Sequence, residues 1–150
     1  MANDVPEVAA AIEQLVRVSR SFDVSQTVSR TGGSLLRRLV DDGPARITAL
    51  AEAEHVSQPA MTAAIKRLAA QGFVTRETDP DDARAARVVI TDQGAKLVAA
   101  WREQLARRVA DVVENQDPQH RRQLVDALPA LNRLSGLLRE SLQEISRETP

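Results

Sequence analysis

The sequence predicts a mainly α-helical protein that carries one small β-hairpin. Of its 150 residues, 43% are hydrophobic but only 2% are aromatic. A core without aromatic rings has to be built from Leu, Val, Ile and Ala, which suits packed helices better than stacked sheets. Apolar residues recur every three or four positions along most of the chain, whereas two short β-branched runs flank a single polar turn. The length fits one domain, residues 1–150, with a sizeable core.

Composition excludes several classes of function. The chain has no Cys, which rules out disulfides, thiolate nucleophiles and Cys-based zinc sites. No apolar run is long enough to span a membrane and the N-terminus lacks a signal pattern, so we expect a cytoplasmic protein without membrane contact. The net charge is −1. Binding to a polyanion would therefore depend on local basic groups rather than on overall attraction.

Two helices are predicted in the first third of the chain. The first covers residues 6–22, because one face carries a stripe with helical spacing: Val8, Ile12, Leu15, Ser19 and Phe22. The second begins at Ser29, a typical N-cap residue, and its inward residues are Leu35, Leu36 and Leu39. Gly32 and Gly33 are expected to loosen its first turns, since glycine costs about 1 kcal/mol relative to Ala inside a helix.

Two more helices and a hairpin follow. A short helix is predicted from Thr48, as its N-cap, to about Glu54. After a tight turn at His55, Ser57 caps a helix that reaches Gln71. Residues 73–76 and 87–90 look like two short strands, joined by a long polar tip over residues 79–84.

The C-terminal third reads as two long helices. Thr91 caps the first, whose stripe is Leu97 or Val98, Trp101, Leu105, Val109 and Val112. The second starts at Asp117-Pro118 and carries an a/d seam, typical of a helix packing along another helix: Leu124, Leu128, Leu131, Ser135, Leu138, Leu142 and Ile145. Pro129 interrupts this seam and predicts either a kink or two shorter helices. The seam and the first stripe predict a homodimer, with residues 6–22 and 92–146 as its dimerisation region.

Residues 29–91 have the order of a winged helix-turn-helix, a lobe that binds duplex DNA. The helix after Ser57 has a core face of Met61, Ala64, Ile65 and Leu68, and an outward face of Gln58, Pro59, Thr62, Ala63 and Lys66. Gln can pair with adenine, Thr can contact a thymine methyl group or a phosphate, and Lys can reach guanine or phosphate. The helix N-terminus and Ser57 would also contact the DNA backbone. These features predict that this helix enters the major groove.

The hairpin places two arginines where they could contact DNA, Arg84 near the tip and Arg87 further along. An arginine on a projecting tip can enter a narrow A·T-rich minor groove. Alternatively, Arg84 pairs with Asp81 or Asp82 and holds the shape of the tip. Both alternatives stay open at the level of sequence.

The chain resembles the multiple-antibiotic-resistance regulator (MarR) family over residues 28–94. The resemblance rests on these segments: Leu36-Arg37-Arg38-Leu39-Val40-Asp41-Asp42-Gly43-Pro44 with Ile47-Thr48-Ala49-Leu50-Ala51, then Val56-Ser57-Gln58-Pro59-Ala60-Met61-Thr62, then Asp79-Pro80-Asp81-Asp82-Ala83-Arg84, and finally Ile90-Thr91-Asp92-Gln93-Gly94. The last two segments, which form the wing motif, are the most specific.

This resemblance implies a homodimeric repressor that releases DNA when a small phenolic or anionic ligand binds. By position it assigns Arg84 to the wing and five residues to the major groove: Ser57, Gln58, Pro59, Thr62 and Lys66. Three positions depart from the family pattern, namely His55 at a turn often held by Gly, Ala83 in place of a second wing arginine, and Ala63 in place of a longer polar residue.

Other functions are less well supported by the sequence. There is no Gly-rich phosphate loop, nucleophile elbow or His-Glu metal motif, so we expect no enzyme and no cofactor. His55 and His120 are explained as a turn residue and a helix-surface residue rather than as metal ligands. A dimeric protein-interaction module is the alternative to DNA binding. Four residues are candidates for the walls of an effector pocket, although core packing or a solvated charge would explain each: Arg20, Phe22, Leu39 and Trp101.

Overall fold

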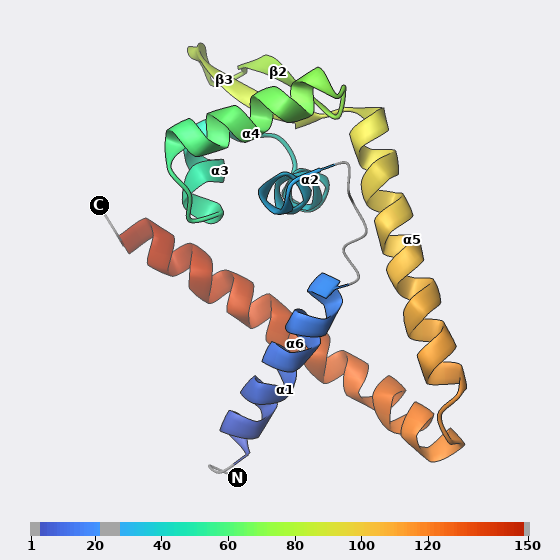
Figure 1. The fold of residues 1–150 in the computed structure, drawn as a ribbon. Helices are drawn as coiled ribbons and strands as arrows, with labels where there is room; N and C mark the ends of the chain where they lie inside the picture. The colour runs from blue at the N-terminus through green and yellow to red at the C-terminus, as the bar shows by residue number, and fades with distance from the viewer. Residues whose placement is uncertain (1–3, 22–27, 149–150) are drawn as a thin grey trace. The chain divides into compact units, whose positions relative to one another are not determined.

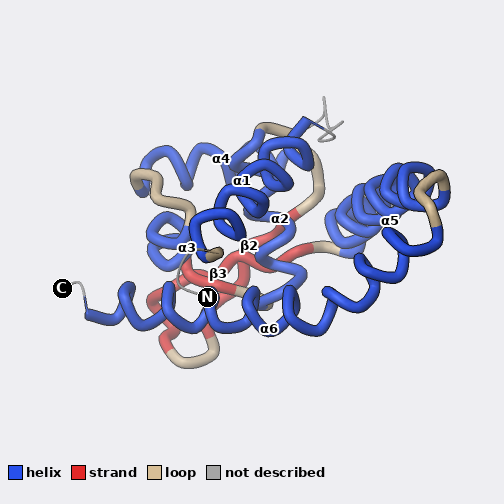
Figure 2. The backbone as a smooth tube through the Cα atoms, turned by 90° about the horizontal axis from the view of Figure 1, so that it is seen from below, coloured by secondary structure: helices blue, strands red, loops and turns tan. Residues whose placement is uncertain are grey.

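The computed structural model describes residues 4–21 and 28–148. It contains helices and one small sheet (Figures 1 and 2), with these bounds: α1 (Val5–Ser21), α2 (Arg30–Asp42), β1 (Ala45–Arg46), α3 (Ile47–Ala53), α4 (Gln58–Ala70), β2 (Val74–Asp79), β3 (Asp82–Ile90), α5 (Asp92–Glu114) and α6 (Pro118–Glu148). The predicted class, mainly α with a small β-hairpin, is confirmed. The chain forms two compact units, Met1–Leu105 and Ala106–Pro150.

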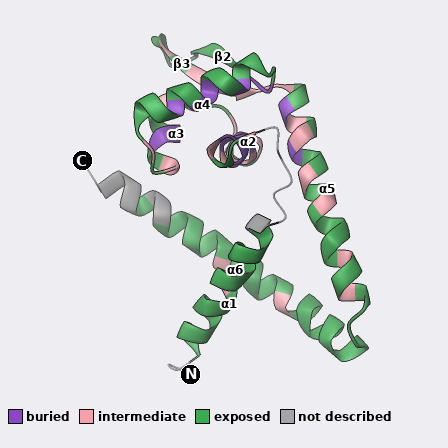
Figure 3. Cartoon of the chain, viewed as in Figure 1, coloured by how far each residue is buried: buried purple, intermediate pink, exposed green. Residues whose placement is uncertain are grey.

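The core of the first unit lies where α2, α3 and α4 pack on one another and on the sheet. Buried aliphatic residues come from every one of these elements and from the start of α5 (Figure 3): Leu35, Leu36, Leu39, Leu50, Met61, Ile65, Leu68, Val88 and Val98. Burying one such side chain contributes about 1.5–3 kcal/mol. The core therefore fixes the inner face of α4, and the outer face of the same helix stays exposed.

The two glycines of α2, which were expected to loosen its first turns, lie in a helix that is continuous from Arg30 to Asp42. Both are buried, and the helix begins normally because the Ser29 side chain accepts a hydrogen bond from the amide of Gly32. A Cβ at Gly32 would lie 2.6 Å from Cγ1 of Val28 and 3.4 Å from Cδ2 of Leu68. A side chain at this position would therefore collide with Val28, in the segment that leads into α2, whereas Leu68 of α4 lies at an ordinary van der Waals distance.

A short strand, β1, was not predicted, and it changes how α3 begins. The sheet has the order β1-β3-β2, with Arg46 paired to Arg87 in antiparallel register. Because the chain leaves this strand directly into the helix, Arg46 is the N-cap of α3 and no side chain caps it. The prediction that Thr48 is the N-cap was therefore wrong.

The hairpin is longer than predicted, and its tip is short. Strands β2 and β3 continue outward until Asp79 faces Asp82, with only Pro80 and Asp81 between them. A bulge follows Thr78. Polar side chains mask the strand signal, because this part of the hairpin projects from the core and needs no apolar alternation. We call β2, β3 and this turn the wing.

The second unit contains the end of α5 and all of α6. As predicted, Asp117 starts α6, and its Oδ1 accepts hydrogen bonds from the amides of Gln119 and His120 at 2.9 and 3.1 Å. The helix is continuous through Pro129, so the alternative of two shorter helices was wrong. Among the described residues, no helix combines the length and the apolar character needed to cross a membrane.

Candidate nucleic-acid interface

The turn between α3 and α4 is set by one residue with a left-handed backbone. His55 has a φ of 51°, the only positive φ of a non-glycine residue among those described. Its amide donates to the carbonyl of Glu52 at 3.0 Å, and the amide of Val56 donates to that of Ala51 at 3.0 Å. The tight turn predicted at His55 is confirmed, and residues other than Gly adopt a left-handed backbone of this kind with some strain.

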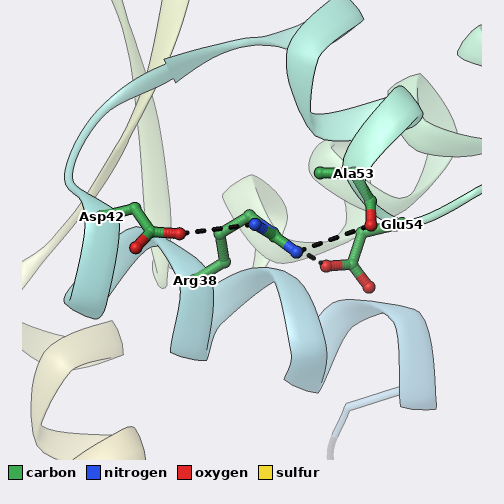
Figure 4. A network of polar contacts seen from close by, with 4 residues as sticks. All are labelled: Arg38, Asp42, Ala53 and Glu54. Carbon is green, nitrogen blue, oxygen red and sulfur yellow. Dashed lines mark hydrogen bonds and ion pairs between the residues drawn. The ribbon is translucent and has the colours of Figure 1, made fainter. Parts of the chain in front are cut away.

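Arg38 ties the end of α3 to α2 (Figure 4). Its Nε donates to Oε1 of Glu54 at 3.1 Å, its Nη1 lies 3.3 Å from Oδ2 of Asp42, and its Nη2 donates to the carbonyl of Ala53 at 3.5 Å. Glu54 is the C-cap of α3, where carbonyl groups have no partner within the helix. One guanidinium therefore holds the segment from which α4 emerges.

Helix α4 presents the predicted major-groove residues on its exposed face. Ser57 caps it, accepting a hydrogen bond from the amide of Ala60 at 3.3 Å, and a proline occupies its first turn. Exposure is common to all five predicted contact residues: Ser57, Gln58, Pro59, Thr62 and Lys66. The opposite face is buried through Met61, Ala64, Ile65 and Leu68. The helix thus has one anchored face and one polar face, with its free amides at the exposed N-terminus.

The two wing arginines differ in their surroundings. Arg84 is exposed, and its guanidinium forms no ion pair or hydrogen bond within the described parts of the chain. Its backbone amide, rather than its side chain, donates to Oδ1 of Asp82 at 3.0 Å. Arg87 lies further from the tip, where its Nη2 is 3.5 Å from Oε2 of Glu77 and its buried Nε has no hydrogen-bond partner among the residues that the structure describes. Arg84 is therefore available to a ligand, whereas Arg87 is engaged within the wing.

An ion pair that was not predicted from the sequence joins the wing to the helix-turn-helix. Nε of Arg46 donates to Oδ2 of Asp79 at 2.6 Å, and the amide of Asp81 donates to Oδ1 of Asp79 at 2.9 Å. The hydrogen bond from Arg46 lowers the pKa of Asp79 from its ordinary value, and the amide of Asp81 acts in the same direction. No local pattern signals this pair, because its two members are 33 residues apart in sequence.

Of the four predicted wall residues, the structure describes the side chains of two, Leu39 and Trp101. Leu39 is a core residue, and Trp101 packs against the same core with the guanidinium of Arg37 over its ring, 5.2 Å from the centroid. Phe22 and the side chain of Arg20 lie outside the described residues. The structure does contain a pocket of about 300 Å³ between the start of α2 and the second half of α4, lined by Val28, Ser29, Ala64, Arg67, Leu68, Ala70 and Gln71.

Comparisons with known proteins agree with this arrangement. The model of the MarR family matches residues 28–86. An HTH-type transcriptional regulator of Mycobacterium tuberculosis is 38% identical over 108 residues, which cover 69% of this chain and 76% of that protein. A solved structure from Mycobacterium tuberculosis aligns with a TM-score of 0.74 and 26% identity, over 91% of this chain and 95% of that one. The structure of BpsR from Bordetella bronchiseptica, whose DNA binding is regulated by 6-hydroxynicotinic acid, aligns with a TM-score of 0.51 and 21% identity, over 83% and 89% of the two chains.

The matched region coincides with the lobe described above. It begins just before α2 and ends in β3, and so includes α3, the turn at His55, α4 and most of the wing. The family comprises DNA-binding transcription regulators rather than enzymes. From its fold, its helix-turn-helix and its relatives, this chain belongs to the MarR family of transcription regulators.

Proposed function

We propose that the protein binds a specific duplex operator as a homodimer and represses transcription in a bacterial cytoplasm. One observation supports the proposal above the others, namely that α4 combines a face fixed in the core with an exposed, capped N-terminal face carrying Gln58 and Thr62. An α-helix fits the major groove of B-DNA, which is about 12 Å wide. In that placement Gln58 and Thr62 read base edges, and Ser57, Pro59 and Lys66 contact the backbone or neighbouring bases.

The exposed apolar rows of the long helices support the homodimer. On α1, Val8 and Leu15 are exposed, and on α6 the seam residues Leu124, Leu128 and Leu131 are exposed as well. Soluble monomers rarely leave such patches uncovered. A twofold dimer would bring two copies of α4 to one face of DNA. The operator is then a pseudopalindrome with half-site centres about 10 bp apart.

A small aromatic or anionic effector would release the DNA. Support comes from the pocket against α4, whose lining combines apolar side chains with Arg67 and Ser29. A ligand there would contact the helix that enters the major groove, so its binding and DNA binding would be linked. Benzoate, a small aromatic anion, is a suitable probe: titrated into the protein–DNA complex, it should lower the bound fraction, and an unchanged fraction at saturating benzoate would contradict the effector.

Selection of bound duplexes from a random library at near-physiological salt tests the DNA-binding proposal. The expected result is an inverted repeat with about one-turn spacing. Thr62→Ala and Gln58→Ala should each relax base preference at one position of each half-site, at a cost of about 1–3 kcal/mol for the preferred base. Lys66→Ala should weaken all duplexes and reduce the salt slope by about 1.

Lys96→Ala is the matched control, because Lys96 is the other lysine of the chain and lies exposed on α5. It should leave base preference and salt slope as they are. Unchanged binding by both Thr62→Ala and Gln58→Ala would refute the assignment of this helix face. Failure of the folded dimer to select any motif would favour the protein-interaction module instead.

A further inference from the structure

The wing carries an acidic residue in an unusual environment. Asp79 is the only buried polar or charged residue among those that the structure describes, with 8% of its surface exposed. A buried carboxylate is costly unless both of its oxygens are satisfied. Here Oδ2 accepts from Arg46 at 2.6 Å and Oδ1 accepts from the amide of Asp81 at 2.9 Å. Asp79 is therefore held from two sides, by β1 and by the wing turn.

These two contacts connect the wing tip to the helix-turn-helix. Arg46 belongs to β1 and is also the residue from which α3 begins. Asp79 ends β2, immediately after the bulge that interrupts the ladder between β2 and β3. A bulge increases local twist and bending, so the ladder alone leaves the direction of the tip weakly specified. The ion pair supplies the missing constraint.

The tip that this pair holds is the part of the wing that presents Arg84. Beyond Asp79 the chain turns through Pro80 and Asp81, and Oδ1 of Asp82 then accepts from the amide of Arg84 at 3.0 Å. A continuous series of short contacts thus runs from the start of α3 to the backbone of Arg84. Along this series, a change in the direction of the turn moves the Arg84 guanidinium relative to α4.

We propose that the Arg46–Asp79 ion pair, called here the clamp, positions Arg84 for a contact in the minor groove that flanks the major-groove site of α4. The inference rests on the proposed function and extends it. It assigns a positioning role to two residues, Arg46 and Asp79, that do not themselves contact DNA bases. Because a narrow A·T-rich minor groove attracts an inserted arginine, Arg84 gives a preference for A·T pairs at those flanks. The clamp maintains that preference by directing the wing tip.

A double-mutant cycle on flank preference tests the clamp. The duplex is the motif selected by the wild-type protein, with flanking A·T pairs replaced by G·C pairs or by inosine·C pairs, which lack the minor-groove amino group of guanine. Arg84→Ala should lose a preference of roughly tenfold for A·T over G·C flanks. Asp79→Asn should lose the same preference, and the double variant should lose no more than either one, because both changes remove one contact. Arg46→Lys keeps the ion pair and should keep the preference.

Asp41→Asn is the matched control, since Asp41 pairs with Arg102 at the same distance, 2.6 Å, away from the wing. It should leave flank preference unchanged. If Asp79→Asn lowers the melting temperature so far that the variant is not folded, Arg46→Gln replaces it in the cycle. The side chain of Arg46 is half exposed, so its substitution disturbs the core less.

The clamp would be overturned, while the proposed function stands, by losses that multiply in the double variant, by full flank preference in Asp79→Asn, or by a wild-type protein that selects a motif without flank preference. A uniform loss on all duplexes in Asp79→Asn would show a structural role only, and would also overturn it. A wild-type protein that selects no motif contradicts the proposed function itself.

Discussion

At the scale of single residues, Gly94 shows why the wing and α5 meet as closely as they do. A Cβ at this position would collide with the carbonyl oxygen of Phe73 and lie 2.8 Å from Cγ1 of Ile90. That carbonyl cannot shift freely, because it accepts a hydrogen bond from the amide of Thr91 at 3.0 Å. Thr91 also donates its hydroxyl to the carbonyl of Gly72 at 2.6 Å and accepts from the amide of Gly94. The glycine is required by space rather than by backbone conformation.

Gly94→Ala should therefore destabilise the protein by about 1–3 kcal/mol, as expected for overpacking against a fixed backbone. Gly136→Ala in α6 is the matched control, because among the described residues no atom outside its chain neighbours and the adjacent backbone of its own helix lies within 4 Å of the added Cβ. It should stabilise the protein by roughly 0.5–1 kcal/mol through helix propensity. Urea denaturation at one protein concentration measures both free energies of unfolding, and effects of the same sign would contradict this account.

At the scale of elements, the parts of the fold that local signals specify were predictable. Ser29, Ser57 and Thr91 cap their helices as expected, because capping depends on residues three positions away. The strand β1 was not predictable, since two residues are too few to show a pattern. The contact of Arg46 with Asp79 was not predictable either, because it depends on how that strand meets the wing. Arg87 shows the same limit: a contact with DNA was predicted from its position, but the residue opposite it in the sheet, Glu77, was not predictable.

The joint between β1 and the wing should weaken in acid. The folded protein lowers the pKa of Asp79, so it favours the ionised carboxylate more than the unfolded chain does. The stabilisation is complete above the ordinary aspartate pKa of about 3.9 and is lost as the pH falls through the lower, folded value. The difference in free energy of unfolding between the wild type and Asp79→Asn should thus be constant near neutral pH and shrink below about pH 4. In a protein that already carries Arg46→Gln, Asp79→Asn should lower the free energy of unfolding by less than it does in the wild type. An equal loss in the two proteins at every pH would argue against the ion pair.

At the scale of the whole molecule, α1 and α6 carry rows of exposed apolar side chains. Figure 3 shows α1 and α6 as almost entirely exposed where they are described, in contrast to the purple positions of α2 and α4. Seam residues Leu124, Leu131 and Leu138 are 50%, 44% and 52% exposed. The predicted seam continues to Leu142 and Ile145, whose side chains lie outside the described residues. This surface is the reason for proposing a dimer.

Leu131→Asp should weaken the dimer about a thousandfold, because a buried Leu contributes about 2 kcal/mol and twofold symmetry counts it twice. Arg133→Glu is the control: it also changes charge on α6 but lies on the face opposite the seam. Sedimentation equilibrium at micromolar concentration should show a dimer for the wild type and for Arg133→Glu, and a monomer for Leu131→Asp. A stable wild-type monomer would exclude the proposed assembly.

The position of Trp101 has a consequence for spectroscopy. The chain contains one Trp and no Tyr, so its near-ultraviolet emission comes from a single indole. That indole is half-buried at the contact of α5 with α2, with the Arg37 guanidinium over its face and Gly33 beside it. An adjacent positive charge and partial exclusion of water both alter the colour and lifetime of indole emission. The unlabelled protein thus contains a fluorophore at the joint between its DNA-binding lobe and the helix that leads away from it.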